Sequence, residues 1–82
     1  MKFVWDENKR LANLVNHRLD FADLGLAFFA RASVRPTYSN RLIAFGGFRG
    51  GTIIAVVFKP LGGEAVSVIS MRPASRRERS LL

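Results

Sequence analysis

Three runs rich in Val, Ile and Phe fill the second half of the chain and constrain its fold more than any other feature. They cover residues 41–48, 52–59 and 64–72, and each has the composition of a β-strand. Gly50-Gly51 suits a tight two-residue turn between the first two runs, and Pro60–Gly63 suits a longer turn before the third. Three strands joined in this way most simply form an antiparallel meander.

The first half of the chain shows helical signals behind a short opening strand, Lys2–Trp5. Asp6 is a suitable N-cap for a helix over residues 7–16. One stripe of this helix is apolar and consists of Leu11, Leu14 and Val15. The opposite face is polar and consists of Lys9, Asn13 and Asn16. His17 lies at the edge between the two faces.

A second helix is predicted over residues 21–30, with Asp20 as its N-cap and Asp23 placed to complete a capping box. This helix is apolar nearly all round, and its large side chains are Phe21, Leu24, Leu26, Phe28 and Phe29. One sheet does not cover so much apolar surface. We therefore expect part of this helix to face another chain.

Residues 31–40 lack periodicity and are interrupted by Pro36, which predicts a loop. The pair Ser75 and Glu78 has capping-box spacing and opens a short third helix. The order strand, helix, helix, three strands and helix stub predicts an α+β fold, with two helices packed on a small antiparallel sheet. A chain of 82 residues is expected to form a single domain over residues 1–82.

Several classes of protein are excluded by what the sequence lacks. The absence of cysteine excludes a disulfide scaffold, a thiolate zinc site and a cysteine nucleophile, and it fits a reducing compartment such as the cytoplasm. We expect no signal peptide, and the longest strictly apolar stretch, residues 53–58, is too short to span a membrane. The glycine-rich segment 46–51 lies between two predicted strands, so it is a turn and not a phosphate loop. No metal or cofactor is expected.

The formal net charge of +7 lies entirely in residues 31–82, because four basic and four acidic side chains balance in residues 1–30. Eight of the nine basic groups in the second part are arginines, which can hold a phosphate through two parallel hydrogen bonds. This distribution indicates a polyanionic partner, either nucleic acid or a strongly acidic protein. A basic surface that serves solubility is the alternative.

Some of these residues could cleave RNA without a metal ion. In that reaction the 2′-hydroxyl attacks its own phosphate while a base removes a proton, an acid protonates the leaving oxygen and cations stabilise the transition state. His17 is a candidate acid or base, because an unperturbed imidazole titrates near ~6.5. The alternative is a histidine that caps the end of its helix.

Arg72 ends the third predicted strand and is a candidate phosphate ligand. Alternation along the strand places it on the face of Val66, Val68 and Ser70. The following helix offers free amides at its start, which could hold the same anion. A solvated arginine at a strand end is the alternative interpretation.

Other candidates have equally plain alternatives. Trp5 could stack a base, or it could pack in the core or an interface. Lys9 could contact a phosphate, or it could be an ordinary surface lysine. The three arginines of the last helix form either a solvated face or a phosphate-positioning patch: Arg76, Arg77 and Arg79.

Two segments at the ends of the chain resemble the BrnT toxin family. The first is the opening segment 2–9, KFVWDENK, with the residues that follow it at Asn13, His17 and Phe21. The second is the closing segment 68–79, VISMRPASRRER. Between them, Arg41 and the pair Phe45-Gly46 stand where the family has an arginine and an aliphatic residue followed by glycine.

This resemblance implies a bacterial toxin of a type II toxin–antitoxin system, with a fold similar to that of the RelE ribonuclease toxins. The implied activity is metal-independent RNA cleavage that stops translation. The implied partner is a BrnA-like antitoxin with a ribbon-helix-helix domain. The complex would bind DNA only through the antitoxin. On this basis Arg72 and Arg41 would hold phosphate, His17 would transfer protons and Lys9 would assist.

The chain departs from the family pattern at three positions. Ser67 stands where the family usually has an arginine, Pro73 where it commonly has a lysine, and Leu82 where it often has an aromatic residue. These differences support a second interpretation, a toxin-like module that binds an antitoxin or RNA and cleaves poorly. A free-standing nucleic-acid binder is a third.

Overall fold

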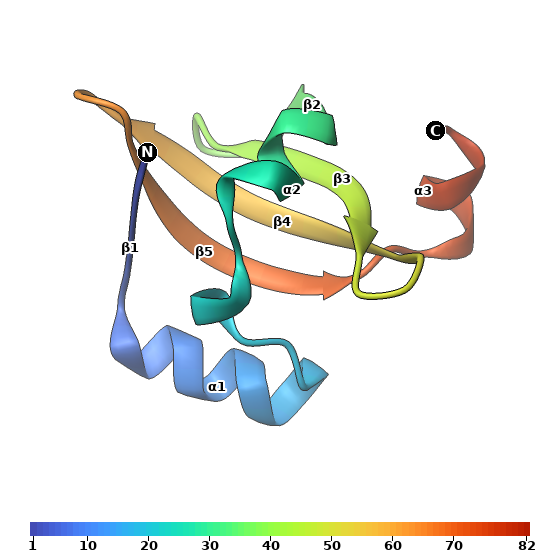
Figure 1. Ribbon diagram of the computed structural model, residues 1–82, viewed down its shortest axis with the longest axis horizontal. Coiled ribbons are helices and arrows are strands. Elements are labelled where there is room, and N and C mark those ends of the chain that lie inside the picture. Colours follow the sequence, from blue (N-terminus) through green and yellow to red (C-terminus); the bar gives the residue numbers. More distant parts are fainter.

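The computed structural model describes residues 1–82 and shows a five-stranded mixed sheet with helices packed against it (Figure 1). The strand order is β1-β5-β4-β3-β2, in which β1 runs parallel to β5 and all other neighbours are antiparallel. The strands are β1 Lys2–Trp5, β2 Ser33–Pro36, β3 Leu42–Phe48, β4 Thr52–Leu61 and β5 Ala65–Pro73. The predicted α+β class and the three-stranded meander are confirmed.

One strand was missed by the sequence analysis. Residues 33–36 form β2, which pairs with β3 at the edge of the sheet, whereas residues 31–40 were expected to be a loop. Pro36 does not prevent this, because a residue without an N–H is tolerated on an edge strand. The expected loop is therefore reduced to the short turn between β2 and β3.

Helix α1, Glu7–His17, begins at the predicted cap, where the Asp6 side chain accepts from the amide of Asn8 at 2.8 Å. It runs along the edge of β5 and in the same direction as that strand (Figure 1). Its polar face, not its apolar stripe, is the one that meets the rest of the molecule. Asn13 is its one buried residue, while the apolar stripe lies exposed at Leu11, Leu14 and Val15.

The buried Asn13 explains this orientation. Its side-chain oxygen accepts from the amide of Met71 at 3.0 Å, and its amide donates to the carbonyl of Leu19 at 2.9 Å. Strand β1 stops at Trp5, opposite Val68, and so does not reach that part of β5. The Asn13 side chain supplies the hydrogen bond that a neighbouring strand would otherwise make.

The predicted helix over residues 21–30 is two pieces. A 3₁₀ turn, η1 Phe21–Asp23, is followed by an extended Leu24-Gly25 and then by the short helix α2 Leu26–Arg31. Asp20 caps η1 through the amide of Ala22, but the side chain of Asp23 does not reach back to the cap. The break makes both pieces fit over one face of the sheet (Figure 1).

This break also allows most of the large apolar side chains in the segment to be buried. Phe21, Leu24 and Phe28 are buried and Phe29 packs against the core, so only Leu26, at 58% exposure, faces solvent. The expectation that part of this segment faces another chain therefore rests on Leu26 alone and stays a prediction. The exposed apolar face of the molecule lies on α1 instead.

A bulge in β5 sets the direction of the last strand. The pairing shifts between Val57↔Ser70 and Phe58↔Val68, which leaves Ile69 without a partner. Beyond the bulge, Arg72 lies opposite Ala55, away from the face that carries the main core. The prediction that Arg72 shares a face with Val66 and Val68 is wrong, because one extra residue reverses the alternation.

The chain ends in helix α3, Arg76–Ser80, where the predicted capping box is confirmed. The Ser75 hydroxyl accepts from the Glu78 amide at 3.1 Å, and a Glu78 carboxylate oxygen accepts from the Ser75 amide at 2.8 Å. None of the helices has the length and apolar character needed to cross a membrane.

Candidate functional site at the arginine-rich end of the sheet

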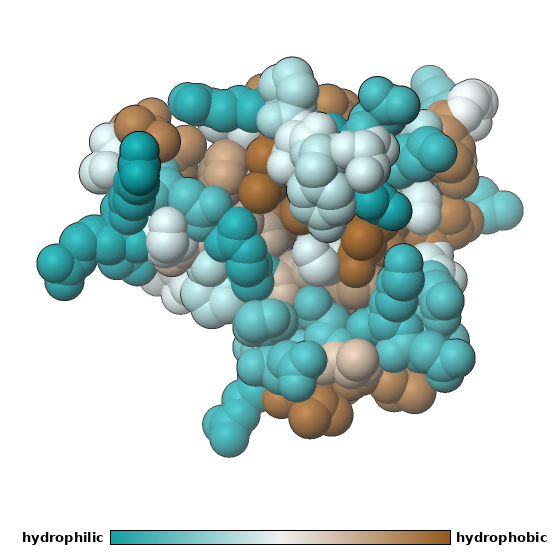
Figure 2. Space-filling view, turned by 180° about the vertical axis from the view of Figure 1, so that it is seen from behind, coloured by the Kyte–Doolittle hydropathy of each residue, from teal (hydrophilic) through white to brown (hydrophobic).

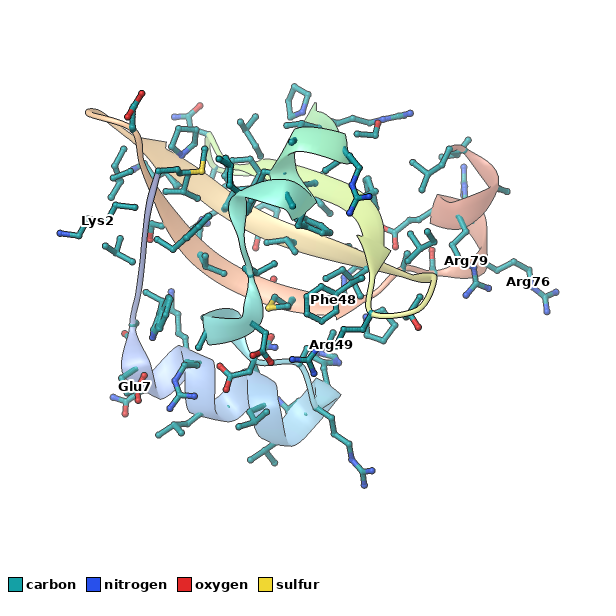
Figure 3. All side chains as sticks on the ribbon, viewed as in Figure 1. Lys2, Glu7, Phe48, Arg49, Arg76 and Arg79 are labelled. Atoms are coloured by element: carbon teal, nitrogen blue, oxygen red, sulfur yellow. The ribbon has the colours of Figure 1, made fainter.

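Seven of the ten arginines lie in segments near the end of the sheet where β3 and β5 finish. Arg49 lies in the β3–β4 turn, Arg72 near the end of β5, and Arg18 directly after α1. Figure 3 shows Arg76 and Arg79 at one extreme of the molecule, Lys2 and Glu7 at the other, and Arg49 between them. We call this surface the arginine-rich end and define it as Arg18, Arg31, Arg49, Arg72, Arg76, Arg77 and Arg79.

A hollow of about 360 Å³ opens at this end, beside the β3–β4 turn. Arg31, at the last position of α2, and Arg49 line it together with Phe48 and the glycines of the turn. The guanidinium of Arg49 lies 5.3 Å from the Phe48 ring centroid and forms an ion pair of 2.8 Å with Asp23. Two cations from separate parts of the chain thus border one open space.

The backbone of this turn is unusual for its sequence. Arg49 has φ +46°, in the left-handed region that favours glycine, and Gly50 and Gly51 follow at +76° and +96°. A glycine or asparagine would adopt the Arg49 conformation with less strain. The sequence pattern predicts only a turn here, and Arg31 and Arg49 were not among the predicted site residues, although an arginine inside a glycine-rich turn was a visible signal.

Arg72 is held in place by a carboxylate. Its two terminal nitrogens donate to the two oxygens of Glu78 at 2.7 and 2.8 Å, and its side chain remains 36% exposed. The Arg72 guanidinium, more than any other group, lowers the pKa of Glu78 to about 2, and Glu78 in turn raises the pKa of Arg72. The predicted anion site between Arg72 and free amides of α3 is therefore already filled by Glu78.

Helix α1 brings His17 toward the same end. Asn13 is bonded to Met71, and His17 lies one helical turn, about 6 Å, further along. Two residues of β5 cover a similar distance, so His17 comes level with Pro73, next to Arg72 in sequence. His17 is exposed and its ring makes no hydrogen bond, so the structure does not support the alternative of a helix-capping histidine.

Lys9 and Arg41 are not gathered at this end. Lys9 is exposed one turn before Asn13. Arg41 precedes β3, four residues before Phe45, which is level with Arg72 across the sheet. That spacing is about 13 Å along the strand. Arg41 stacks over Tyr38 at 5.3 Å, and its buried Nε has no hydrogen-bond partner.

Trp5 is fixed by its neighbours. Its ring lies edge-on to Phe21 at 6.4 Å between centroids, and its Nε1 donates to a Glu7 oxygen at 3.1 Å. Arg10 binds the same carboxylate. The hydrogen bond from Arg10, followed by the one from Trp5, lowers the pKa of Glu7 to about 2. These contacts favour the packing interpretation of Trp5. The three arginines of α3 are exposed and form no ion pair, which leaves both of their interpretations open.

Comparison with known proteins places the chain in one family. A family model described as "Ribonuclease toxin, BrnT, of type II toxin-antitoxin system" matches residues 5–78. The chain is 59% identical to the ribonuclease toxin BrnT of Brucella abortus, whose crystal structure was solved at 1.1 Å resolution. That match has a TM-score of 0.86 and covers 93% of this chain and 99% of the other. No curated protein matches the chain. The chain belongs to the BrnT family of ribonuclease toxins of type II toxin–antitoxin systems.

Proposed function

We propose that this toxin is a metal-independent endoribonuclease of the cytoplasm that stops translation and binds its RNA across the arginine-rich end. The observation that carries the proposal is the charge at this end. Seven arginines lie there, and only Asp23 and Glu78 form ion pairs with any of them. Such an excess of fixed cations attracts a phosphate backbone and stabilises the additional negative charge of a cleavage transition state.

Arg72 is the proposed phosphate ligand at the reacting centre. Glu78 engages both terminal nitrogens, and one of these nitrogens also donates to the Pro73 carbonyl at 3.4 Å. A guanidinium has five N–H donors, so Nε and one hydrogen of the other terminal nitrogen stay available. Glu78 then acts as a positioning residue that holds the Arg72 side chain in one direction. A fixed donor stabilises developing charge without reorganising during the reaction.

His17 is the proposed proton-transfer residue, because α1 carries it to the level of the β5 end. It would take the proton of the attacking 2′-hydroxyl or return one to the leaving oxygen. Arg41 is too far along the sheet to share a phosphate with Arg72. Its unpartnered Nε supports a role with a different phosphate of the same RNA strand. Lys9, Trp5 and the α3 arginines would assist RNA binding.

The proposed partner is a BrnA-like antitoxin with a ribbon-helix-helix domain, which would neutralise the toxin and bring the complex to DNA. A type II toxin has an antitoxin partner, and the basic surface of this chain suits an acidic one. The ribbon-helix-helix identity comes from the family resemblance alone.

The test is cleavage of a single-stranded RNA by the purified chain with a chelator present. We expect cleavage, with Arg72→Ala lowering the rate by about 100-fold or more, as for other groups that stabilise transition-state charge. The matched control is Arg35→Ala, which removes the same charge from the exposed edge strand β2. It should change the rate by less than about threefold. Loss of all cleavage in chelator would refute metal independence, and equal effects of the two variants would remove Arg72 from the site.

A second candidate function is supported by the Arg72–Glu78 pair. The Glu78 carboxylate already binds both terminal nitrogens of Arg72. This is expected for a structural ion pair in a module that binds RNA and cleaves it poorly. The same experiment separates the two. RNA binding without cleavage, in buffers with and without divalent metal ions, would favour the second function.

A further inference from the structure

The solvent-facing side of α1 is apolar, although a surface helix normally turns that side to the core. We define the α1 stripe as Leu11, Leu14 and Val15, which are exposed by 47%, 37% and 80%. At about 100° per residue, Leu11 and Val15 each lie within about 20° of the pole opposite the buried Asn13. Figure 2 shows hydrophobic side chains gathered along the lower edge, where α1 lies.

Polar contacts, not the stripe, attach α1 to the rest of the molecule. Asn13 and Arg10 attach α1 to the rest of the molecule, through Met71, Leu19 and Asp20. Single exposed apolar residues are ordinary, but three that share one helix face form a surface suited to another protein. The spacing i, i+3, i+4 is the pattern that an amphipathic helix presents to a partner.

The charges around the stripe indicate the chemistry of that partner. Glu7 and Arg10 neutralise each other, which leaves Lys9 and Arg18 as unpaired cations on and just after the helix. Arg18 directly follows α1 and belongs to the arginine-rich end. An apolar surface therefore continues into a strongly basic one within a single helical turn.

We propose that the α1 stripe is a docking site for the antitoxin, which would bind it through an amphipathic helix followed by an acidic segment. The apolar residues of that helix would cover the stripe, and the acidic segment would reach the arginine-rich end and block it. A second copy of this chain fits less well, because each copy would bring Arg18 and its neighbouring arginines against like charge. The inference rests on membership of a toxin–antitoxin family and not on where RNA binds.

The test measures binding of the purified cognate antitoxin, by calorimetry or surface plasmon resonance. Val15→Glu should weaken binding by about 100-fold, since it places an unpaired charge at the centre of the contact and opposite an acidic partner. Val15→Lys should weaken binding less, by about 10-fold, because its charge is complementary to the partner. Val15 is 80% exposed, so both variants should fold normally, with an unchanged melting temperature.

The matched control is Leu26→Glu on α2, an exposed leucine from the segment first expected to meet another chain. It should leave the affinity within about twofold. A loss of binding in Leu26→Glu with wild-type binding in Val15→Glu would overturn the proposal. So would a toxin that is dimeric alone and becomes monomeric in Val15→Glu, because a second copy would then be the occupant.

RNA cleavage keeps this test separate from the proposed function. Val15→Glu should cleave RNA as wild type does when no antitoxin is present, and the antitoxin should fail to inhibit it at concentrations that inhibit wild type. If the chain cleaves no RNA at all, the binding measurements alone still decide the docking site.

Discussion

Asn13→Ala should be among the most destabilising single changes in this toxin, although a polar residue on a surface helix would ordinarily be dispensable. The side chain is 7% exposed and makes two hydrogen bonds to backbone groups that lie outside its own helix. One of them is the amide of Met71, a fully buried residue that has β4 on one side and no strand on the side of β1. The substitution leaves both backbone groups without a partner.

The magnitude follows from those two groups. An orphaned buried donor or acceptor costs about 1–3 kcal/mol, and water can reach the carbonyl of the half-buried Leu19 more easily than the amide of Met71. We therefore expect a loss of about 2–4 kcal/mol in the free energy of unfolding. For a domain of this size that is a large fraction of a total stability of about 5–15 kcal/mol.

Urea denaturation followed by circular dichroism measures the loss. With a slope of about 1 kcal/mol per molar urea, the midpoint should fall by about 2–4 M. Asn16→Ala, an exposed position on the same helix, should stay within about 0.5 kcal/mol of wild type. If Asn13→Ala were as stable as Asn16→Ala, the hydrogen bonds to Met71 and Leu19 would not be what orients α1, and its exposed apolar stripe would need another explanation.

Three further changes test the ends of the sheet. Arg72 chiefly lowers the pKa of Glu78 to about 2 from its ordinary value near 4.5, so the pairing stabilises α3 fully above about pH 4.5 and this stabilisation is lost as the pH falls toward 2. NMR titration of this carboxyl group measures the pKa, and a midpoint near 4.5 would refute the prediction. Gly46→Ala should cost about 1–3 kcal/mol in chemical denaturation, because an added Cβ lies 3.1 Å from the packed ring of Phe28, whereas Gly47→Ala meets nothing within 4 Å and should be nearly neutral. Arg49→Gly should leave stability unchanged or higher and lower the salt dependence of RNA binding by about 0.7 in log–log slope, and an unchanged slope would exclude a phosphate contact there.

The strands were predictable because their signal is local. Runs of β-branched and aromatic residues between glycine turns fixed three antiparallel strands within one or two residues of their observed ends. Strand β2 was not predicted because its four residues pair only at the edge of the sheet and carry few core side chains. Edge strands have weak hydrophobic alternation, and a proline in one removes the remaining signal.

Helix orientation was not predictable from periodicity. The pattern of α1 points to an inward apolar stripe, and the opposite is found because Asn13 satisfies a strand edge that only the full topology reveals. The rule that apolar faces turn inward fails where a partner chain covers them, so the failure is itself evidence for a docking surface. The prediction of one helix over residues 21–30 failed for a different reason. Gly25 allows an extended break inside a pattern that otherwise favours one helix.

Part of the candidate site was visible in the sequence. Arg72 and the capping box of α3 were recognised, but their direct contact was not, because the capping glutamate was not expected to bind the arginine as well. Arg31 and Arg49 meet only through the packing of α2 beside the β3–β4 turn, which no spacing in the sequence encodes.

The bulge at Ile69 links the fold to the chemistry of the site. The core residues of β5 change from even to odd positions, from Val66 and Val68 to Met71, and this switch was a readable sign of an extra residue. Without the bulge, continued alternation would turn Arg72 toward the apolar core, where an unpaired guanidinium is strongly disfavoured. With the bulge, Met71 fills the core while Arg72 reaches Glu78. A single unpaired residue in the last strand therefore decides whether Arg72 belongs to the arginine-rich end.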